Sequence, residues 1–456
     1  MFRPIIFLEM KSDIIIIGAG PGGYEMAADA AQQGLQVTII EKNHPGGTCL
    51  NRGCIPTKAL CRNAEVINLL KEAEQWGVMV DNLSLDYNIA HARKDTVVTQ
   101  LREGVAMLMK QPGVNYVTGE ATIIDAHTVE ANGENYIAEN IVIATGSAPR
   151  GLPIEGTELA MTSDDILEMT ELPKSLCIVG GGVIGMEFAA IFNSFGVEVS
   201  VIEFCKEILP PFDKDIAKRL KTVLSKRGVN IMTQAAVNGI HKNDEGMLEI
   251  TFEQKGKAKS VIAEQVLMSV GRKPVIPNGA EEAGINVGRR GIEVDSHMMT
   301  SVNGIYAIGD VNGLCMLAHA ATAQGAKALH HIMGKQDNIN LDIVPSAVFT
   351  TPELSMVGLT EDQCAEREMN VVVKKSFFRS NGKAVSMGET DGLVKMIVEA
   401  DSRKIVGCHI CGPHAADLIQ EVVTAMQCEA TVDSIATAIH GHPTLSEVIM
   451  ATAKQF

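Results

Sequence analysis

The sequence predicts an α/β fold with two dinucleotide-binding βαβ units and a smaller C-terminal α+β domain. Two observations lead to this prediction. A β-branched strand, a glycine-rich turn, a helix and a second strand ending in glutamate occur twice, and the interval from first glycine to glutamate is identical in both copies. Beyond Pro345 the pattern changes to antiparallel-looking strands followed by helices, with no nucleotide signature.

Length and charge limit the function further. The 456 residues are too many for one core and predict about three domains. A net charge of −16 argues against binding nucleic acid or an anionic membrane surface. Ten scattered cysteines suit an intracellular enzyme rather than a disulfide scaffold, so we expect a cytoplasmic protein. The apolar start is too short to span a membrane and resembles no signal peptide, and Met1 and Met10 are both candidate starts.

The first copy of the repeat occupies residues 12–41. In its GAGPGG turn, Gly18 permits a tight bend, Gly20 lets a pyrophosphate approach, and Gly23 lets helix and strand pack closely. Glu41 ends the second strand, where a carboxylate reaches a ribose hydroxyl. Because strand, helix and acid are all present, a dinucleotide site is favoured over a mere turn.

The second copy occupies residues 175–203, with Gly180, Gly182 and Gly185 in its turn and Glu203 at its end. A carboxylate accepts the ribose 2′-hydroxyl and repels a 2′-phosphate, so this site is expected to prefer NAD over NADP. The alternative is a surface glutamate at a strand end. Two copies predict that the chain binds two dinucleotides.

Two cysteines, Cys49 and Cys54, lie in the stretch GGTCLNRGCIPTK. We expect a glycine-flanked turn there that leads into a helix beginning near Lys58. If the turn merges with the first helical turn, the sulfurs come within bonding distance, and a helix N-terminus favours the reactive thiolate. The residues alone leave two interpretations open, a redox pair or two unrelated thiols, since Cys61 shows that stray cysteines occur nearby.

Other polar and small residues mark strand ends. A buried strand, residues 141–143, ends in a small-residue turn, and we place the first domain boundary after it. Asp310 ends another strand and is expected to face a cofactor, because ligands bind at the carboxyl ends of parallel strands. Gly119 marks either close approach to a ligand or a simple bend.

The chain ends with a histidine–glutamate cluster, HGHPTLSE. His442 precedes proline and is therefore expected in an extended or turn conformation just before a helix. Thr444 to Glu447 fits a capping box. Glu447 either caps that helix or orients His442 as a base, and both roles are compatible.

These motifs together resemble one family. GGTCLNRGCIPTK, ATGS, GGGVIGMEF, VGRKP, AIGDV, MLAHAA and HPTLSE are similar to the FAD-dependent pyridine nucleotide–disulfide oxidoreductases, from about Ser12 to Ala451. The resemblance implies an FAD-binding domain over residues 1–150, an NAD-binding domain over 151–275, a return to the FAD domain over 276–343 and a dimerisation domain over 344–456.

The resemblance also implies the cofactor contacts. The residues expected to bind FAD are Gly18, Gly20, Gly23, Glu41, Thr48, Lys58, Gly119, Thr145, Gly146, Ser147, Asp310 and Ala318. Those expected to bind NAD are Gly180, Gly182, Gly185, Glu203, Val237 and Gly271.

The chemistry that the resemblance implies is thiol–disulfide exchange coupled to hydride transfer. Cys49 would be the exchange thiol and Cys54 the flavin-side thiol. The base, His442, would come from the partner subunit of a homodimer, with Glu447 orienting it. Lys58 would lie near the flavin N5 and pair with Glu187.

Within the family the chain is most similar to members that oxidise dihydrolipoyl groups on the lipoyl domains of 2-oxoacid dehydrogenase or glycine cleavage complexes. A mercuric reductase, an NADPH-dependent disulfide reductase and a non-enzymatic redox sensor are the alternatives. The C-terminus lacks a vicinal cysteine pair and Glu203 opposes NADPH, which disfavours the first two. Cys408 and Cys411 are unfamiliar, and we expect buried thiols rather than a metal site.

Overall fold

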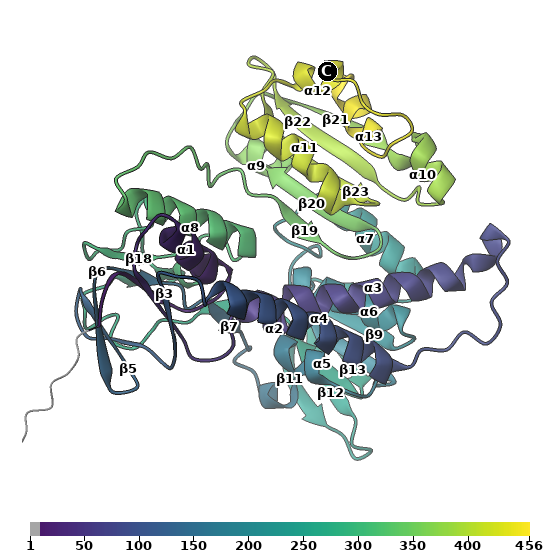
Figure 1. Ribbon diagram of the computed structural model, residues 1–456. Coiled ribbons are helices and arrows are strands. Elements are labelled where there is room, and N and C mark those ends of the chain that lie inside the picture. The colour runs from purple at the N-terminus through teal and green to yellow at the C-terminus, as the bar shows by residue number, and fades with distance from the viewer. Residues whose placement is uncertain (1–9) are drawn as a thin grey trace, which may run out of the picture. The chain divides into compact units, whose positions relative to one another are not determined.

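The computed structural model describes residues 10–456 and divides into two compact units (Figure 1). The first unit contains the described residues up to Ala59, Ala92–Arg150 and Arg272–Leu341. The second contains Leu60–His91, Gly151–Gly271 and Asp342–Phe456. The question of a start at Met1 or Met10 lies outside the described residues. The four-part division expected from the sequence stays a prediction.

The first unit is built on a seven-stranded sheet of order β3-β2-β1-β6-β5-β4, with β18 paired to β6. The strands around β1 are parallel, as the buried β-branched runs predict, and β5 and β4 add an antiparallel edge. The unit also contains two two-stranded sheets, β15-β7 and β16-β17. The strands of the whole unit are β1 (Met10–Ile17), β2 (Val37–Glu41), β3 (Val114–Thr118), β4 (Thr122–Ile123), β5 (Thr128–Ala131), β6 (Glu134–Ile143), β7 (Ser147–Pro149), β15 (Arg272–Pro274), β16 (Val287–Gly288), β17 (Gly291–Ile292) and β18 (Ile305–Ala307).

Helices α1 (Pro21–Gln32) and α8 (Ala318–Ile332) lie side by side in this unit (Figure 1). They approach closely because small residues face each other: a Cβ added at Gly22 would lie 3.0 Å from the carbonyl oxygen of Ala321. The other helical segments of the unit are α2 (Gly47–Arg52), the 3₁₀ turn η3 (Gly309–Asn312), the beginning of α3 (Cys54–Lys71) and most of α4 (Tyr87–Leu108).

The second unit contains the second copy of the repeat, a parallel sheet of order β10-β9-β8-β14. An antiparallel sheet of order β11-β12-β13 belongs to the same part of the chain. The strands are β8 (Ser175–Val179), β9 (Glu198–Glu203), β10 (Asn230–Thr233), β11 (Ala235–Lys242), β12 (Leu248–Gln254), β13 (Lys257–Ala263) and β14 (Gln265–Met268). The helical segments are the remainder of α3 and α4, α5 (Ser163–Glu168), α6 (Val183–Ser194), α7 (Lys214–Lys226), and the 3₁₀ turns η1 (Ala73–Trp76) and η2 (Thr157–Leu159).

The C-terminal part of the second unit contains an antiparallel sheet of order β19-β20-β23-β22-β21. The antiparallel strands predicted beyond Pro345 are thereby confirmed. Helix α11 packs on β20 and β23, whereas α13 packs on β21 and β22 (Figure 1). The strands are β19 (Ser346–Val348), β20 (Glu353–Gly358), β21 (Val371–Phe377), β22 (Leu393–Glu399) and β23 (Ile405–Gly412). The helices are α9 (Glu361–Glu366), α10 (Gly382–Met387), α11 (Ala415–Gln427), α12 (Val432–Thr437), α13 (Glu447–Ala453) and the 3₁₀ turn η4 (Phe378–Ser380).

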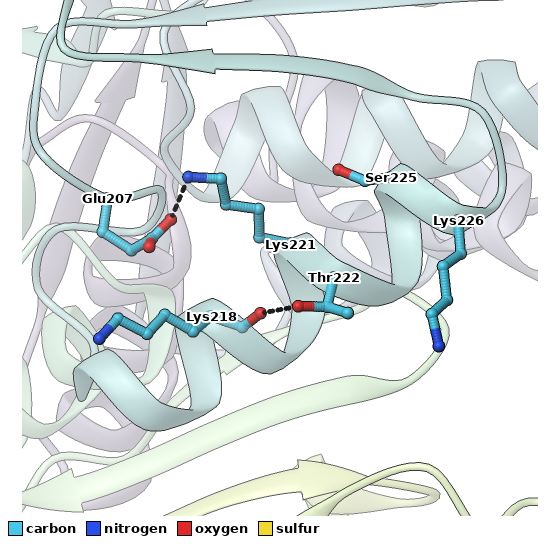
Figure 2. A pocket seen from close by; sticks show the side chains of 6 residues that line it. All are labelled: Glu207, Lys218, Lys221, Thr222, Ser225 and Lys226. Atoms are coloured by element: carbon cyan, nitrogen blue, oxygen red, sulfur yellow. Dashed lines mark hydrogen bonds and ion pairs between the residues drawn. The ribbon is translucent and has the colours of Figure 1, made fainter.

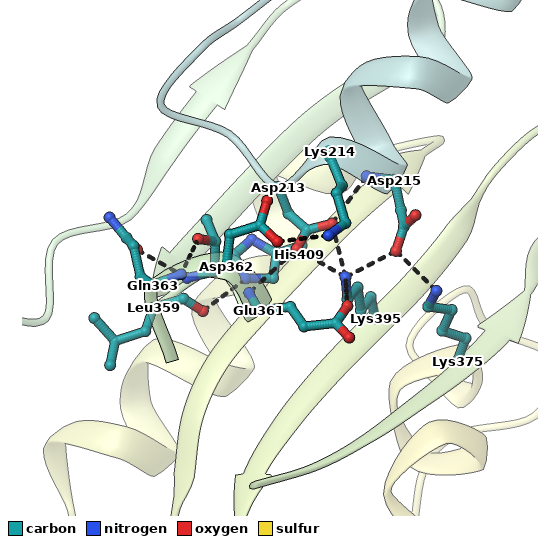
Figure 3. Close-up of polar contacts among 11 residues, drawn as sticks. Asp213, Lys214, Asp215, Leu359, Glu361, Asp362, Gln363, Lys375, Lys395 and His409 are labelled. Atoms are coloured by element: carbon teal, nitrogen blue, oxygen red, sulfur yellow. Dashed lines mark hydrogen bonds and ion pairs between the residues drawn. The ribbon is translucent and has the colours of Figure 1, made fainter. Parts of the chain in front are cut away.

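A buried lysine joins α7 to this C-terminal sheet (Figure 3). Lys395 of β22 is fully buried, and its Nζ lies 2.8 Å from Asp213 Oδ2, 2.8 Å from Asp215 Oδ2 and 2.6 Å from Glu361 Oε2. Burial alone would lower the pKa of Lys395, but the hydrogen bonds to the three carboxylates outweigh burial and raise it. The lysine therefore remains a cation, and we call Lys395, Asp213, Asp215 and Glu361 the lysine cluster.

Among residues 10–456, no helix is both long and apolar enough to span a membrane.

Candidate active site

The two predicted cysteines form a disulfide, with a Cα–Cα distance of 4.6 Å between Cys49 and Cys54. Cys49 lies in the short helix α2, and Cys54 is the first residue of α3. The prediction that the helix begins near Lys58 was therefore wrong by four residues. Pro56 does not prevent the earlier start, because the first N–H groups of a helix have no partner within it. The non-helical backbone is confined to Gly53 between the two helices.

Asn51 holds the loop that carries Cys49. Its Nδ2 donates to the carbonyl oxygens of Pro45 and Gly47, at 3.0 and 2.9 Å. Its Oδ1 accepts a hydrogen bond of 2.7 Å from Arg102 Nε, which comes from α4. Sequence reasoning missed both Asn51 and Arg102, because a contact between residues 51 positions apart leaves no local pattern.

The disulfide loop lies directly against the glycine-rich turn of the first copy. The amide of Gly46 donates to Ala19 O at 2.8 Å, and a Cβ added at Gly47 would lie 2.5 Å from the Cα of Gly20. No side chain larger than hydrogen fits at Gly47. The fold thus brings the disulfide beside the segment predicted to receive the first dinucleotide.

The first turn has the features that a dinucleotide needs. No side chain caps the N-terminus of α1 at Gly20, which leaves the helix end available to a phosphate. A Cβ added at Gly23 would lie 2.0 Å from Gly18 O, so only glycine allows the predicted close packing. Glu41 is buried and its two oxygens accept from the amides of Ala19 and Asn43, both at 2.8 Å. A carboxylate has further lone pairs, so Glu41 can still accept from a ribose hydroxyl.

Asp310 and Ser147 come together at the same end of the sheet. Ser147 Oγ donates to Asp310 Oδ2 at 2.5 Å, and Arg272 Nε donates to Ser147 Oγ at 2.7 Å. Among the described residues Oδ1 of Asp310 has no hydrogen-bond partner in the structure, which leaves an acceptor for a cofactor hydroxyl. Gln324 of α8 accepts from the amide of Gly309 at 2.7 Å and fixes the turn next to Asp310. The prediction that Asp310 follows a parallel strand is confirmed by β18 and η3.

Arg272 and Gln324 were not predicted as site residues, although Arg272 stands in the VGRKP motif. The remaining residues expected at the first site occupy strand and helix ends of the first unit. Gly119 follows β3, where an added Cβ would lie 2.7 Å from the side-chain oxygen of Asn132, so that side chain would have to move. Thr48 and Lys58 lie in α2 and α3, Thr145 and Gly146 follow β6, and Ala318 begins α8.

The second turn repeats the geometry of the first. Glu203 is buried, and its oxygens accept from the amides of Gly181 and Cys205, both at 2.6 Å. A Cβ added at Gly185 would lie 2.0 Å from Gly180 O, as at the equivalent glycine of the first copy. Burial, and then the hydrogen bond and charge of Glu203, raise the pKa of Cys205, so this thiol stays protonated and unreactive.

Three further residues predicted for the second unit are placed as follows. Val237 lies in β11 at a register shift, and Gly271 follows β14. Glu187 is a buried residue of α6 whose Oε1 accepts from the amide of Phe349 at 2.9 Å. Lys58 belongs to the first unit and Glu187 to the second, so their pairing stays a prediction.

His442 and Glu447 form the predicted pair. His442 Nδ1 lies 2.9 Å from Glu447 Oε1, and the His442 side chain is 78% exposed, so its Nε2 side is accessible. The amide of Thr444 and then His442 lower the pKa of Glu447, which keeps the carboxylate charged. An ionised carboxylate at Nδ1 fixes the tautomer in which Nε2 accepts a proton.

The capping box predicted for Thr444 to Glu447 forms only in part. The amide of Thr444 donates to Glu447 Oε2 at 2.9 Å, but Thr444 Oγ1 donates to Gly441 O at 2.7 Å. The N-cap of α13 is Ser446, because the helix begins at Glu447. The prediction of Thr444 as the cap was wrong, since its hydroxyl stabilises the preceding turn.

Two other features lie outside this site. Cys408 and Cys411 are buried as predicted, and burial raises the pKa of each thiol to about 12. Among residues 10–456, no group of three or more His, Cys, Asp or Glu side chains is suited to a metal ion. A pocket on α7 contains none of the predicted site residues (Figure 2). Its lining residues are Glu207, Lys218, Lys221, Thr222, Ser225 and Lys226.

Comparisons with known proteins agree with this geometry. Residues 12–325 match the family described as pyridine nucleotide-disulphide oxidoreductase, and residues 344–453 match its dimerisation domain. The chain is 40% identical to a dihydrolipoyl dehydrogenase of Chlamydia muridarum over 96% of this chain and 95% of that protein. It is 38% identical to one of Geobacillus stearothermophilus over 98% and 96%.

Solved structures give the same fold. The chain matches the copper(II) complex of the HOCl-induced flavoprotein disulfide reductase RclA of Escherichia coli with a TM-score of 0.87. The identity is 29%, and the match covers 98% of this chain and 99% of that one.

Proposed function

The chain belongs to the pyridine nucleotide-disulphide oxidoreductase family, and from this premise we propose that it acts as a dihydrolipoyl dehydrogenase. It is an oxidoreductase that uses FAD and NAD. The observation that supports this function most directly is the Cys49–Cys54 disulfide, whose loop lies against the glycine-rich turn at Gly20. The substrate would be a dihydrolipoyl group, which leaves as lipoyl disulfide while NAD⁺ becomes NADH.

We assign the two cofactors to the two copies of the repeat. In the first unit the turn at Gly20, with Glu41, Ser147 and Asp310, would hold FAD through its pyrophosphate and hydroxyl groups. In the second unit the turn at Gly182, with Glu203, would hold NAD. FAD, when bound, supplies the transfer of two electrons from the cysteine pair to NAD⁺. The residues proposed for these contacts are those predicted from the sequence, with Arg272 and Gln324 fixing the turns beside Asp310.

The protein's own thiols carry the first half of the reaction. His442 takes a proton from one substrate thiol, and the resulting thiolate attacks Cys49 Sγ. The Cys49–Cys54 bond breaks and leaves Cys54 as a thiolate. The second substrate thiol, once deprotonated, attacks the substrate sulfur of the mixed disulfide and displaces Cys49. Two electrons have then moved from the dithiol to the cysteine pair, and the substrate leaves as a disulfide.

We propose that His442 acts on the disulfide of the partner subunit in a homodimer. Residues 344–453, which match the dimerisation domain, contain His442, and its side chain is exposed in the single chain. Mixing Cys49→Ser with His442→Ala subunits tests this arrangement. A mixed dimer has one site with both lesions and one with neither, so activity returns on subunit exchange. Mixed dimers that form and stay inactive would place the base in its own chain.

The decisive assay is reduction of NAD⁺ by purified holoenzyme with dihydrolipoamide. We expect turnover with NAD⁺ and much less with NADP⁺, and faster turnover with a lipoylated domain of a 2-oxoacid dehydrogenase or glycine cleavage complex. Preference for NADPH with another disulfide, or with Hg²⁺, would indicate the alternative reductases, which the curated relatives do not favour. The cytoplasmic location expected from cysteine usage stays a prediction.

A further inference from the structure

A second histidine–glutamate pair lies beside the proposed base. His440 Nε2 lies 2.9 Å from Glu421 Oε1, and His440 Nδ1 lies 3.1 Å from Ala438 O. The His440 side chain is 7% exposed, whereas that of His442 is 78% exposed. Two histidines separated by Gly441 alone thus have the same kind of partner and opposite access to solvent. The side chain of His442 is therefore open to a substrate, whereas that of His440 is largely covered.

Both partners of His440 are hydrogen-bond acceptors. Glu421 lies in α11, so one ring nitrogen joins the turn to that helix and the other bonds to the turn's own backbone at Ala438. His440 also helps to lower the pKa of Glu447, after the larger effects of the Thr444 amide and His442.

The turn that carries His442 has an apolar anchor only at its C-terminal end. Residues 438–446 lie between α12 and α13; Leu445 is buried in the core of the C-terminal sheet and helices, whereas Ile439 is completely exposed. At Gly441 the only neighbour that an added Cβ would meet within 4 Å, among the described residues, is the Thr444 side chain at 3.5 Å. The C-terminal end of the turn is held by Glu447 and by Asn381 Nδ2, which donates to Thr444 O at 2.9 Å.

At the N-terminal end, the contact between His440 and Glu421 of α11 anchors the turn to another element. Without it, the backbone leading through Gly441 to His442 would be fixed from one side only. A misplacement of about 1 Å in a catalytic group costs up to about a hundredfold in rate. The contact therefore controls a distance that the reaction depends on.

We propose that Glu421 and His440 are a positioning pair that sets the place of the His442 imidazole for proton transfer from the substrate dithiol. This inference rests on the proposed function, because it assigns the pair to the thiol half of that reaction. Neither residue touches the reacting atoms. The pair acts through the backbone of Gly441.

The test compares the two half-reactions of the holoenzyme by stopped-flow absorbance under anaerobic conditions. In Glu421→Ala and His440→Ala, flavin reduction by dihydrolipoamide is expected to slow by about ten- to a hundredfold. Flavin reduction by NADH does not use His442 and is expected to stay within about twofold of wild type. Glu421→Gln keeps an oxygen that accepts from His440, so its loss should be smaller than that of Glu421→Ala.

Two controls separate positioning from general damage. Glu429→Gln removes an exposed ion pair with Lys404, 2.7 Å long, in the same part of the chain, and should change neither rate. In a His442→Ala background, Glu421→Ala should cause no further loss, because the pair acts through His442. An equal fall of both half-reactions, or a further loss in that background, would overturn the inference.

Measurements on the wild-type enzyme distinguish a failure of this inference from a failure of the proposed function. If dihydrolipoamide reduces wild type and Glu421→Ala at the same rate, the positioning role is wrong and the proposed function stands. If NADH reduces the wild-type flavin but dihydrolipoamide does not, the proposed function is wrong, and the inference that rests on it is wrong too.

Discussion

The two dinucleotide-binding copies share their turns and differ in what surrounds them. In both, a buried glutamate accepts hydrogen bonds from two backbone amides. In both, the third glycine of the turn lies so close to the carbonyl oxygen of the first that a Cβ would overlap it. Around Gly20, however, the disulfide loop approaches so closely that a Cβ added at Gly47 would lie 2.5 Å from Gly20 Cα. Around Gly182 no described atom outside its chain neighbours lies within 4 Å of an added Cβ.

This difference suggests different roles for the same motif. The first turn is partly covered by the disulfide loop, and α8 packs on its helix, as expected for a cofactor that stays bound. Among the described residues no segment packs on Gly182 in this way, as expected for a nucleotide that exchanges in every cycle. The two copies therefore share the turn expected to receive a dinucleotide and differ in the segments that pack against it.

The surroundings also differ in chemistry. The first copy is held by close backbone contacts between glycine and alanine. In the second unit, Asp213 caps α7 and accepts from Lys395 of the C-terminal sheet (Figure 3). Charged side chains thus connect the segment after the second copy to the C-terminal sheet. Contacts between small residues instead connect the helix of the first copy to α8. The four predictions below test this comparison, from the largest expected effect to the smallest.

Removing the buried cation should separate the stabilities of the two units. Lys395→Ala leaves three carboxylates of the lysine cluster without their shared cation, and breaking a buried pair in this way costs about 3–5 kcal/mol. Trp76, the single tryptophan, lies in the second unit, so its fluorescence reports unfolding of that unit. Its urea midpoint should fall well below the midpoint of flavin release.

The exposed pair between Lys404 and Glu429 provides the control for that experiment. Lys404→Ala should move neither midpoint by much, because exposed ion pairs contribute about 0–1 kcal/mol. If tryptophan fluorescence and flavin release shift together in Lys395→Ala, the cluster does not act on the second unit alone.

The acid at the end of each copy gives the second prediction. Glu203→Arg should weaken NAD use and permit NADP use, since one charged hydrogen bond is worth about 1.5–3 kcal/mol, roughly ten- to a hundredfold. The measurement is the ratio of kcat/KM for the two nucleotides. Glu41→Arg should instead change flavin retention and leave that ratio unaltered. A wild type that already prefers NADPH would contradict the reading of Glu203.

Much of this comparison could be predicted from the sequence, because its basis is local. Strand, turn, helix and acid follow each other within 30 residues, so periodicity and glycine spacing identified both copies and the strand before Asp310. The start of α3 was misplaced because the cysteine stretch contains glycine and proline, which are typical of turns. The helix can nevertheless begin at Cys54, because Pro56 lies within its first turn, where a missing N–H breaks no helical hydrogen bond.

Contacts between distant segments were not predictable in this way. Lys395 lies in one of the strands expected beyond Pro345, and a lysine is expected to face solvent there. It is buried because carboxylates from α7 and α9 surround it, 182 and 34 positions away in the sequence. The packing of Gly47 on Gly20 and the contact of His440 with Glu421 are likewise tertiary, so a single sequence shows the residues but not their pairing.

A methyl group at the third glycine of each turn gives the third prediction. Gly23→Ala and Gly185→Ala each place a Cβ 2.0 Å from a carbonyl oxygen, an overlap that costs about 1–3 kcal/mol. The first variant should be purified with less bound flavin. The second should keep its flavin, be reduced by dihydrolipoamide at the wild-type rate and show a raised KM for NAD⁺. Equal flavin loss in both variants would show that the copies do not have separate ligands.

The smallest effect concerns acid stability of the second unit. Burial opposes the charged form of Asp215, but hydrogen bonds from Lys375 and Lys395 outweigh it and lower its pKa to about 2. An unfolded aspartate has a pKa of about 3.9, so this carboxylate contributes stability above about pH 4 and loses that contribution as the pH falls toward 2. Asp215→Asn removes the titrating group, and solvent screening limits the contribution to about 1 kcal/mol.

The urea midpoint of Trp76 fluorescence should therefore fall less steeply between pH 4 and pH 2 in Asp215→Asn than in wild type. At pH 7 the variant should be slightly less stable, because the charged pairs with Lys375 and Lys395 are lost. Asp244→Asn provides a matched exposed control in the same unit, and its profile should follow wild type. Parallel profiles for wild type and Asp215→Asn would show that Asp215 does not couple the second unit to pH, and that the lysine cluster acts through Asp213 and Glu361 instead.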